Sequence, residues 1–226
     1  MLDTHLSTLS KKKEGVKMSK TKSHIKKYQL KDKCSFKALS NCGHCSREQL
    51  LSIKGMSDKR INNYIKDGII KKDINYDKNT KSNIEAYKLT DYGRTFINKN
   101  FGISHHYVPQ SINHDLEITN KYLSLTEKEQ STFKNETVLK NEFYQLIEQY
   151  RNEPYIDTDG TELYYDDLWN RYHNGDFSCV DCCYTSESGQ VVTYEVETNS
   201  YREQQIVAKI EFCNFMNMEY NSTRVN

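Results

Sequence analysis

The sequence predicts a protein of two domains that combine helices and strands, of the α+β or α/β class. Two observations lead to this expectation, and a third concerns membranes. Charge is distributed unevenly along the 226 residues, although the formal net charge is only +1. The first half shows helical segments followed by a pair of strands, and the second half passes from helical to strand periodicity and back. No segment is long and apolar enough to cross a membrane, so we expect a soluble, cytoplasmic protein.

The charge distribution separates a basic front from an acidic back. Residues 1–33 contain ten Lys or Arg against three Asp or Glu, and residues 34–100 contain thirteen against seven. Residues 101–226 reverse this balance, with nine basic against twenty-one acidic residues. We interpret residues 1–33 as a basic, disordered tail. Only the basic part suits a phosphate backbone, because each neutralised phosphate releases counterions.

The first domain, over residues 34–100, begins with three predicted helices. Apolar positions favour a short helix around residues 36–39. Ser46 is a suitable N-cap for the second helix, with Gln49 as its capping-box partner. Ser57 then caps a third helix, and Gly68 is a typical C-terminal stop.

The third helix has the pattern of a helix that reads DNA. Ile61 and Ile65 share one face at i, i+4 spacing, and the opposite face is polar. Amide side chains can pair with adenine in the major groove, while basic side chains contact the phosphates. The candidate DNA-contacting residues of this helix are Lys59, Arg60, Asn62, Asn63 and Lys66.

A hairpin and a closing helix complete the first domain. Residues 69–75 and 84–89 are typical of strands, and the turn between them carries Lys78 and Lys81 as further candidate DNA contacts. A final helix is expected from about residue 90 to residue 98. This order of helices and hairpin is typical of a winged helix-turn-helix domain, which predicts binding of double-stranded DNA. The alternative is a winged helix used only for protein contacts. Since such proteins often bind paired half-sites, we expect a homodimer.

The second domain follows a linker at residues 101–111 and is expected to be a small α/β domain. We predict helices at 112–125, 134–149 and 201–217, strands at 177–184 and 191–197, a loop at 151–174, and a tail at 218–226.

The helix, hairpin and helix of this second domain resemble the core of the PD-(D/E)xK nucleases. In that resemblance Asp181 and Glu195 hold a divalent metal, Mg²⁺ or Mn²⁺, that activates water. Glu197 occupies the place of the motif lysine, Lys209 is a migrated substitute, and Glu142 is a further acid. The resemblance thus implies Asp181, Glu195, Glu197, Lys209 and Glu142 as candidate catalytic residues. The alternative is that Glu195 and Glu197 form a solvated strand face or a salt-bridge site, without catalysis.

A resemblance to one family covers most of the chain. The first domain is followed by Asn113-His114-Asp115-Leu116, Asp181 and the strand Glu195-Val196-Glu197-Thr198. This order is similar to the replication-relaxation and MobC-like proteins of plasmids and integrative elements. The resemblance implies a sequence-specific DNA-binding protein of a plasmid or phage, accessory to replication, relaxation or mobilisation. Its degenerate nuclease-like domain would serve dimerisation or the binding of replication or mobilisation proteins. Two alternatives remain, a metal-dependent DNA endonuclease targeted by its winged helix and a transcriptional regulator.

Cysteines and histidines offer one further candidate site. Cys34, Cys42, His44 and Cys45 are of the right types for zinc, although buried thiols are the alternative. The second cysteine cluster, around residues 179–183, lies in a predicted strand whose alternation favours ordinary buried thiols. For His105, His106 and His114 we expect linker positions or structural histidines with satisfied hydrogen bonds.

Overall fold

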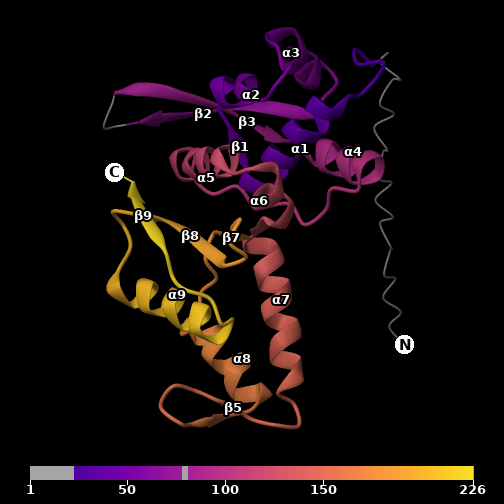
Figure 1. The fold of residues 1–226 in the computed structure, drawn as a ribbon. Helices are drawn as coiled ribbons and strands as arrows, with labels where there is room; N and C mark the ends of the chain where they lie inside the picture. Colours follow the sequence, from indigo (N-terminus) through magenta and orange to yellow (C-terminus); the bar gives the residue numbers. More distant parts are fainter. Residues whose placement is uncertain (1–22, 78–80, 226) are drawn as a thin grey trace, which may run out of the picture.

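The computed structural model describes residues 23–77 and 81–225. Over these residues the chain is a mixed α+β protein with nine helices and three small sheets, which confirms the predicted class. Helices α1–α4 and strands β1–β3 form one end of the molecule, and α7–α9 with the remaining strands form the other (Figure 1). None of the helices in the described ranges is long and apolar enough to cross a membrane. Most of the predicted tail, residues 1–22, lies outside the described residues.

The first part of the chain contains the expected helices and hairpin. Its elements are α1 (Leu30–Cys42), β1 (His44–Cys45), α2 (Arg47–Ser52), α3 (Asp58–Lys66), β2 (Ile70–Asp77), β3 (Ser82–Leu89) and α4 (Asp91–Phe101). Strand β3 is the centre of an antiparallel sheet in the order β1-β3-β2. The capping box of Ser46 and Gln49 is present, and the Ser57 side chain accepts a hydrogen bond from the Arg60 amide. Local capping therefore sets where α2 and α3 begin.

The beginning of the chain is more ordered than the predicted tail. Helix α1 begins at Leu30 instead of near residue 36, so the expected boundary at residue 34 falls inside it. Ile25 is buried, and the Ser23 hydroxyl and the His24 amide both donate to the Asp67 carboxylate at the end of α3. The segment before α1 is therefore packed against α3, because the Ile25 side chain is buried and the Asp67 carboxylate binds Ser23 and His24.

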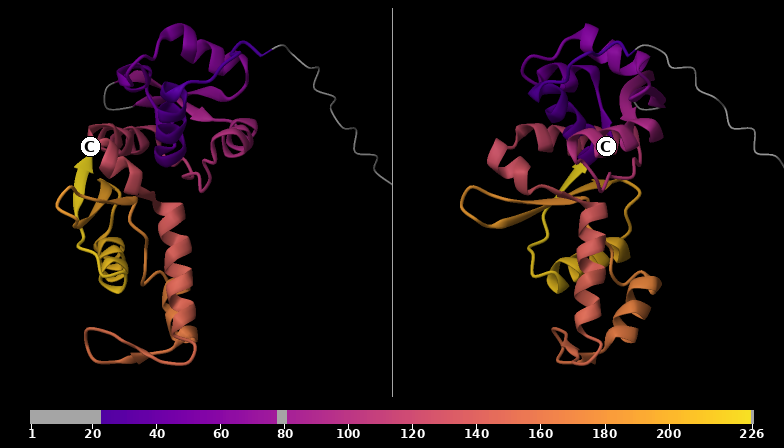
Figure 2. Two further views of the ribbon diagram at one scale, coloured as in Figure 1. Left: turned by 45° about the vertical axis from the view of Figure 1, so that its right-hand side comes forward. Right: turned by 90° about the vertical axis from the view of Figure 1, so that its right-hand side faces the viewer.

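The second part of the chain surrounds a four-stranded sheet. Its elements are α5 (Ile112–Ser124), α6 (Glu127–Thr132), β4 (Lys134–Asn135), α7 (Glu136–Gln149), β5 (Tyr155–Ile156), β6 (Glu162–Leu163), α8 (Tyr165–Asn174), β7 (Cys182–Thr185), β8 (Val191–Thr198), α9 (Glu203–Phe215) and β9 (Ser222–Val225). The strand order is β4-β7-β8-β9, with β9 parallel to β8. Helix α7 leads away from the first part toward the β5–β6 pair, and α9 crosses beside the sheet (Figures 1 and 2).

Three predictions for the second part differ from the structure. The expected strand over residues 177–184 begins only at Cys182, so Asp181 lies in the bend before β7. The expected loop over 151–174 contains α8, which buries Leu168 and ends at Gly175 in the left-handed conformation. The expected tail over 218–226 contains β9, which pairs with β8. Strand β9 was missed because Val225 is its one apolar side chain. Helix α8 was misinterpreted as a loop although Tyr165, Leu168, Trp169 and Tyr172 stand at helical spacing and pack on the core.

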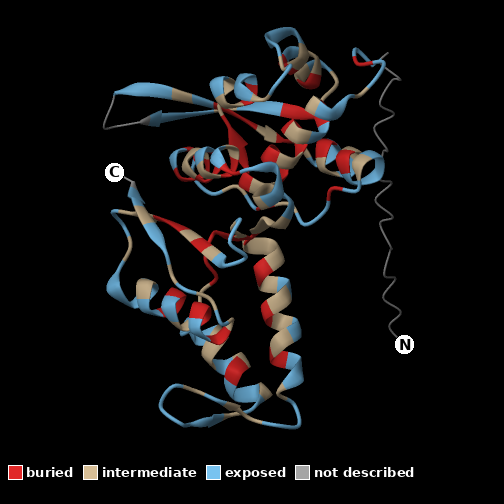
Figure 3. Cartoon of the chain, in the orientation of Figure 1, coloured by how far each residue is buried: buried red, intermediate tan, exposed pale blue. Residues whose placement is uncertain are grey.

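The main core joins the two parts of the chain. It is built from α1, α3, α4, α5 and the first sheet, and it also includes Cys182 of β7 and Val196 of β8. The predicted linker at 101–111 contributes Ile103 and Tyr107, which are both buried. A second core cluster lies between α7, α8 and α9. Figure 3 shows buried residues, in red, in the first sheet, in α5 and in β7 and β8.

Candidate nucleic-acid interface and buried charge cluster

Helix α3 presents the polar face that its sequence predicts. Ile61 and Tyr64 are buried against the core, and the side chains of Asn62, Lys59 and Lys66 are exposed. Asn63 is half-buried. The helix therefore offers amide and ammonium groups to solvent from one surface, which is the chemistry that recognises base edges and phosphates.

Arg60 differs from the predicted DNA contact, because its side chain points inward. Its guanidinium donates two hydrogen bonds to the buried carboxylate of Asp32, at 2.7 and 2.6 Å, and a third to the Lys27 carbonyl oxygen at 2.9 Å. The Tyr64 hydroxyl donates to the same carboxylate. Arg60 therefore links α3 to α1 through two hydrogen bonds from its planar guanidinium to the Asp32 carboxylate. Because the burial of Asp32 in α1 depends on tertiary contacts, no local pattern separates Arg60 from its neighbours on α3.

The β2–β3 hairpin extends well beyond the body of the protein (Figure 1). Its strands pair from Ile70 with Leu89 outward, in one register of eight residue pairs. Most of its outer half is exposed (Figure 3). Lys81 is exposed beside the turn, with φ at 52°. Lys78, the other predicted contact of the turn, lies outside the described residues.

The predicted residues Asp181, Glu195 and Lys209 do come together, but as a closed cluster. Lys209 Nζ lies 2.9 Å from Glu195 Oε1, and the Tyr201 hydroxyl donates to the same oxygen at 2.7 Å. The Asp181 amide donates to Glu195 Oε2 at 2.9 Å. Glu195 is fully buried, and burial, followed by the nearby carboxylate of Asp181, raises its pKa.

A chain of hydrogen bonds leads from this cluster to the first sheet. Asp181 Oδ2 lies 3.0 Å from His114 Nε2, and His114 Nδ1 lies 3.1 Å from Asp115 Oδ1. Asp115 Oδ2 lies 2.7 Å from His44 Nδ1, whose other ring nitrogen is 3.1 Å from Asp73 of β2. Burial opposes the charge on His114, but the carboxylates of Asp115 and Asp181 raise its pKa to about 10. His114 is therefore a cation at neutral pH, held between two buried acids.

Glu142 and Glu197 do not join the cluster, which corrects the expected catalytic set. Glu142 forms an ion pair with Lys134 at 2.8 Å. Glu197 accepts a hydrogen bond from the Tyr220 hydroxyl at 3.0 Å and lies 4.0 Å from Arg224 of β9. Both side chains are occupied by partners outside the Asp181 and Glu195 cluster.

The residues of the cluster do not fit a divalent metal. Asp181 and Glu195 are both buried, and Lys209 and His114 already supply cations to their carboxylates. Within the described part of the chain no three His, Cys, Asp or Glu side chains are arranged to hold a metal ion. A metal would have to displace a buried cation and leave it unpaired, which is costly. The arrangement is that of a structural ion-pair network.

The candidate zinc ligands do not fit a metal either. His44 has Asp115 and Asp73 at its two ring nitrogens. Cys42 and Cys45 are buried, and burial raises the pKa of both thiols, which disfavours the thiolates that bind zinc. His106 Nδ1 lies 2.7 Å from the Ser40 hydroxyl. With His114, it is one of the structural histidines with hydrogen-bond partners that the sequence predicts.

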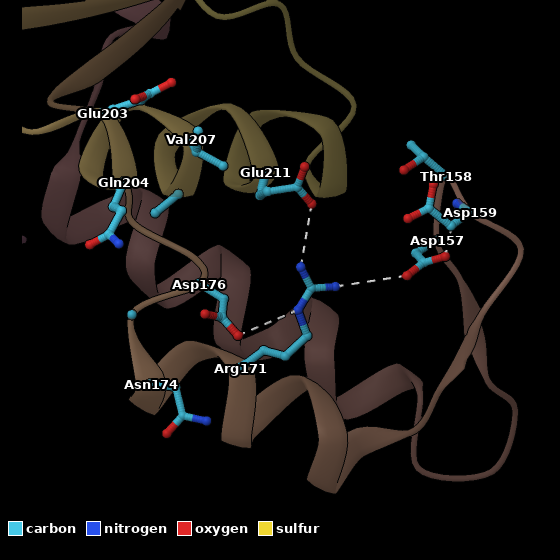
Figure 4. A pocket seen from close by; sticks show the side chains of 12 residues that line it. Asp157, Thr158, Asp159, Arg171, Asn174, Asp176, Glu203, Gln204, Val207 and Glu211 are labelled. Atoms are coloured by element: carbon cyan, nitrogen blue, oxygen red, sulfur yellow. Dashed lines mark hydrogen bonds and ion pairs between the residues drawn. The ribbon is translucent and has the colours of Figure 1, made fainter.

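A cavity of about 690 Å³ lies between α8, α9 and the β5–β6 turn (Figure 4). Arg171 lies among its acids, 3.4 Å from Glu211 and 3.9 Å from both Asp157 and Asp176. Asp159 and Glu203 also line it. Because the cavity is lined by five carboxylates and one guanidinium, this end of the molecule repels phosphate groups and does not suit a nucleic acid.

Comparisons of the chain with models of protein families, with curated protein sequences and with solved structures found no significant match. The family resemblance of the sequence therefore stays a prediction.

Two residues of the buried network, Asp115 and Tyr201, were not named as site residues by the sequence, and His44 was named only as a candidate zinc ligand. Asp32, which pairs with Arg60 in a separate buried cluster, was not named either. Two adjacent residues, His114 and Asp115, do stand in the motif that carries the family resemblance. A charged pair inside an otherwise amphipathic helix was the available signal, because charged side chains are buried only when they have partners. Nothing in the sequence indicated which partners they have.

Proposed function

We propose that this protein binds double-stranded DNA through α3 and the β2–β3 hairpin, which together act as a winged helix-turn-helix unit. One observation carries the proposal: the exposed face of α3 presents Asn62 between Lys59 and Lys66, while the opposite face is held in the core. An α-helix fits the major groove, where an asparagine amide can bind adenine. The exposed hairpin beside it supplies Lys81 for the phosphates.

Charge supports the same assignment. Residues 34–100 carry an excess of basic residues, and the far end of the molecule presents the acidic cavity. DNA is therefore attracted to one end and repelled from the other. We propose that the acidic half acts in dimerisation or partner binding, as in an accessory protein of a mobile element. Binding near a replication or transfer origin would favour that role, and binding within a promoter would favour a transcriptional regulator.

An endonuclease is the second candidate, since Asp181, Glu195 and Lys209 meet from three separate elements. Their burial and their pairing with cations favour a structural role over metal-dependent cleavage.

The test is a titration of the full chain with supercoiled DNA from its own gene neighbourhood, with Mg²⁺ or Mn²⁺ and with EDTA. We expect a band shift that needs no metal and no nicking. Asn62→Ala should weaken binding to the preferred sequence by roughly 1–3 kcal/mol without changing binding to random DNA. Lys81→Ala is the matched variant and should weaken binding to both DNAs alike. Equal losses for both variants on both DNAs would contradict base reading by α3. Metal-dependent nicking that disappears in Asp181→Asn would establish the nuclease instead.

A further inference from the structure

A second basic site lies at the base of the hairpin, on the face of the sheet turned away from α3. Lys71 and Lys88 are paired across β2 and β3, so their side chains share one face. His44 is paired with Lys88 in β1 and contacts Asp115 of α5, which places this face toward α5. The other face carries Ile70, Tyr87 and Leu89 into the core that includes α3.

A cavity of about 310 Å³ opens at this place. It is lined by Lys71, Lys88, Leu89, Thr90, Asp91, Arg94 and Pro109. Three of these side chains are cations, and the single acid among them, Asp91, is fully exposed to solvent. The cavity therefore gathers positive charge from two strands and the first turn of α4.

Donors for a ligand remain free in this cavity. Arg94 forms one long ion pair, from Nη1 to the fully exposed Asp91 at 3.8 Å, and no hydrogen bond from its buried Nε to any described residue. Lys71 is exposed and forms no ion pair within the described ranges. Lys88 already pairs with Asp73, so it contributes charge but fewer free donors. The Arg94 side chain is 35% exposed, so its terminal guanidinium nitrogens can turn toward an anion in the cavity, whereas Nε is closed to solvent.

The geometry points to a phosphate site between Lys71 and Arg94, with Lys88 behind it. A guanidinium and an ammonium placed on one cavity are the groups that bind phosphate oxygens in proteins. The amide dipoles of the first turn of α4 add to the positive potential. The cavity is larger than one phosphate and lies at the small end of ligand pockets, so it fits a phosphate with part of its carrier.

The phosphate has two possible sources, the backbone of a nucleic acid or a soluble phosphorylated molecule. The assignment does not rest on DNA binding by α3, because the two surfaces lie on opposite faces of the sheet. If α3 proves not to bind DNA, the phosphate site can still be measured by itself.

The first experiment is calorimetric titration of the full chain with inorganic phosphate and with pyrophosphate. We expect binding that is weakened about tenfold by Arg94→Gln and by Lys71→Gln, the loss typical of one charge-assisted hydrogen bond. Lys99→Gln removes the same charge from the exposed far end of α4 and should leave binding unchanged. Lys71 is exposed and unpaired, so its variant tests the site even if the Arg94 variant folds poorly.

The second experiment separates the sources by measuring duplex binding against salt concentration. The slope is that of the logarithm of the binding constant against the logarithm of salt concentration. If its magnitude decreases by about one in Lys71→Gln but not in Lys99→Gln, the DNA backbone is the source of the phosphate. An unchanged slope, together with lost phosphate binding, identifies a soluble phosphorylated ligand. The inference is overturned if the wild-type chain binds neither anion and Lys71→Gln leaves the slope unchanged.

Discussion

Arg60 and Lys59 are neighbours on α3, yet the structure gives them opposite roles. Arg60→Ala leaves the buried Asp32 carboxylate without its cation, so we expect the free energy of unfolding to fall by roughly 3–5 kcal/mol. Lys59→Ala removes an exposed charge and should leave stability within about 0.5 kcal/mol while weakening DNA binding. Urea denaturation and band-shift titration of both variants check this. If Arg60→Ala were as stable as the wild-type chain but bound DNA more weakly, Arg60 would be a DNA contact and not a structural residue.

His114 makes stability depend on pH in a direction that can be worked out. Its pKa is about 10 in the folded chain against 6.5 for the free side chain. The stabilisation is therefore complete below about pH 6.5 and is lost as the pH rises to about 10, and it amounts to roughly 5 kcal/mol. We expect urea midpoints to fall over this window in the wild-type chain.

The control for this pH dependence is His114→Gln, which keeps a polar side chain between Asp115 and Asp181 but cannot titrate. Other groups that ionise near pH 10 act in both proteins, so the difference between the two curves isolates His114. Parallel curves would show that His114 is not held as a cation.

Helix α4 approaches the start of β2 so closely that it has no room for a side chain at Gly93. A Cβ placed on Gly93 would lie 1.9 Å from the backbone oxygen of Ile69, which cannot move away without breaking the start of β2. We expect Gly93→Ala to destabilise the fold by more than about 2 kcal/mol, although alanine favours helices elsewhere. Asn98→Ala, at an exposed position of α4, is the control and should be near neutral. Denaturation midpoints decide the matter, and a stabilised Gly93 variant would contradict the contact.

Elements were predictable where local chemistry decides them. The capping hydroxyls of Ser46 and Ser57 mark the starts of α2 and α3, and the alternation around Ile70 and Leu89 marks the hairpin. The site was only partly predictable. Asp181, Glu195 and Lys209 were expected together, but the pairing of Asp181 with His114 joins residues 67 positions apart. Such long-range contacts leave no periodic signal in the sequence.

The expected boundary between the two domains does not separate two hydrophobic cores. Cys182 and Val196 from the second half pack in the same cluster as α1 and the first sheet. The buried chain from Glu195 through Asp115 to His44 also crosses the boundary. Opening the junction would expose apolar side chains and leave buried charges unpaired.

We therefore expect the protein to unfold in one cooperative transition. Differential scanning calorimetry should give a single peak whose calorimetric and van't Hoff enthalpies agree. Asp115→Asn interrupts the charged chain at its centre while keeping the side chain's size, and it should lower the transition temperature of the whole protein. If the variant instead separated the peak in two, the network would be the element that couples the two halves. Two peaks in the wild-type chain would contradict the shared core and would mean that each half is stable alone.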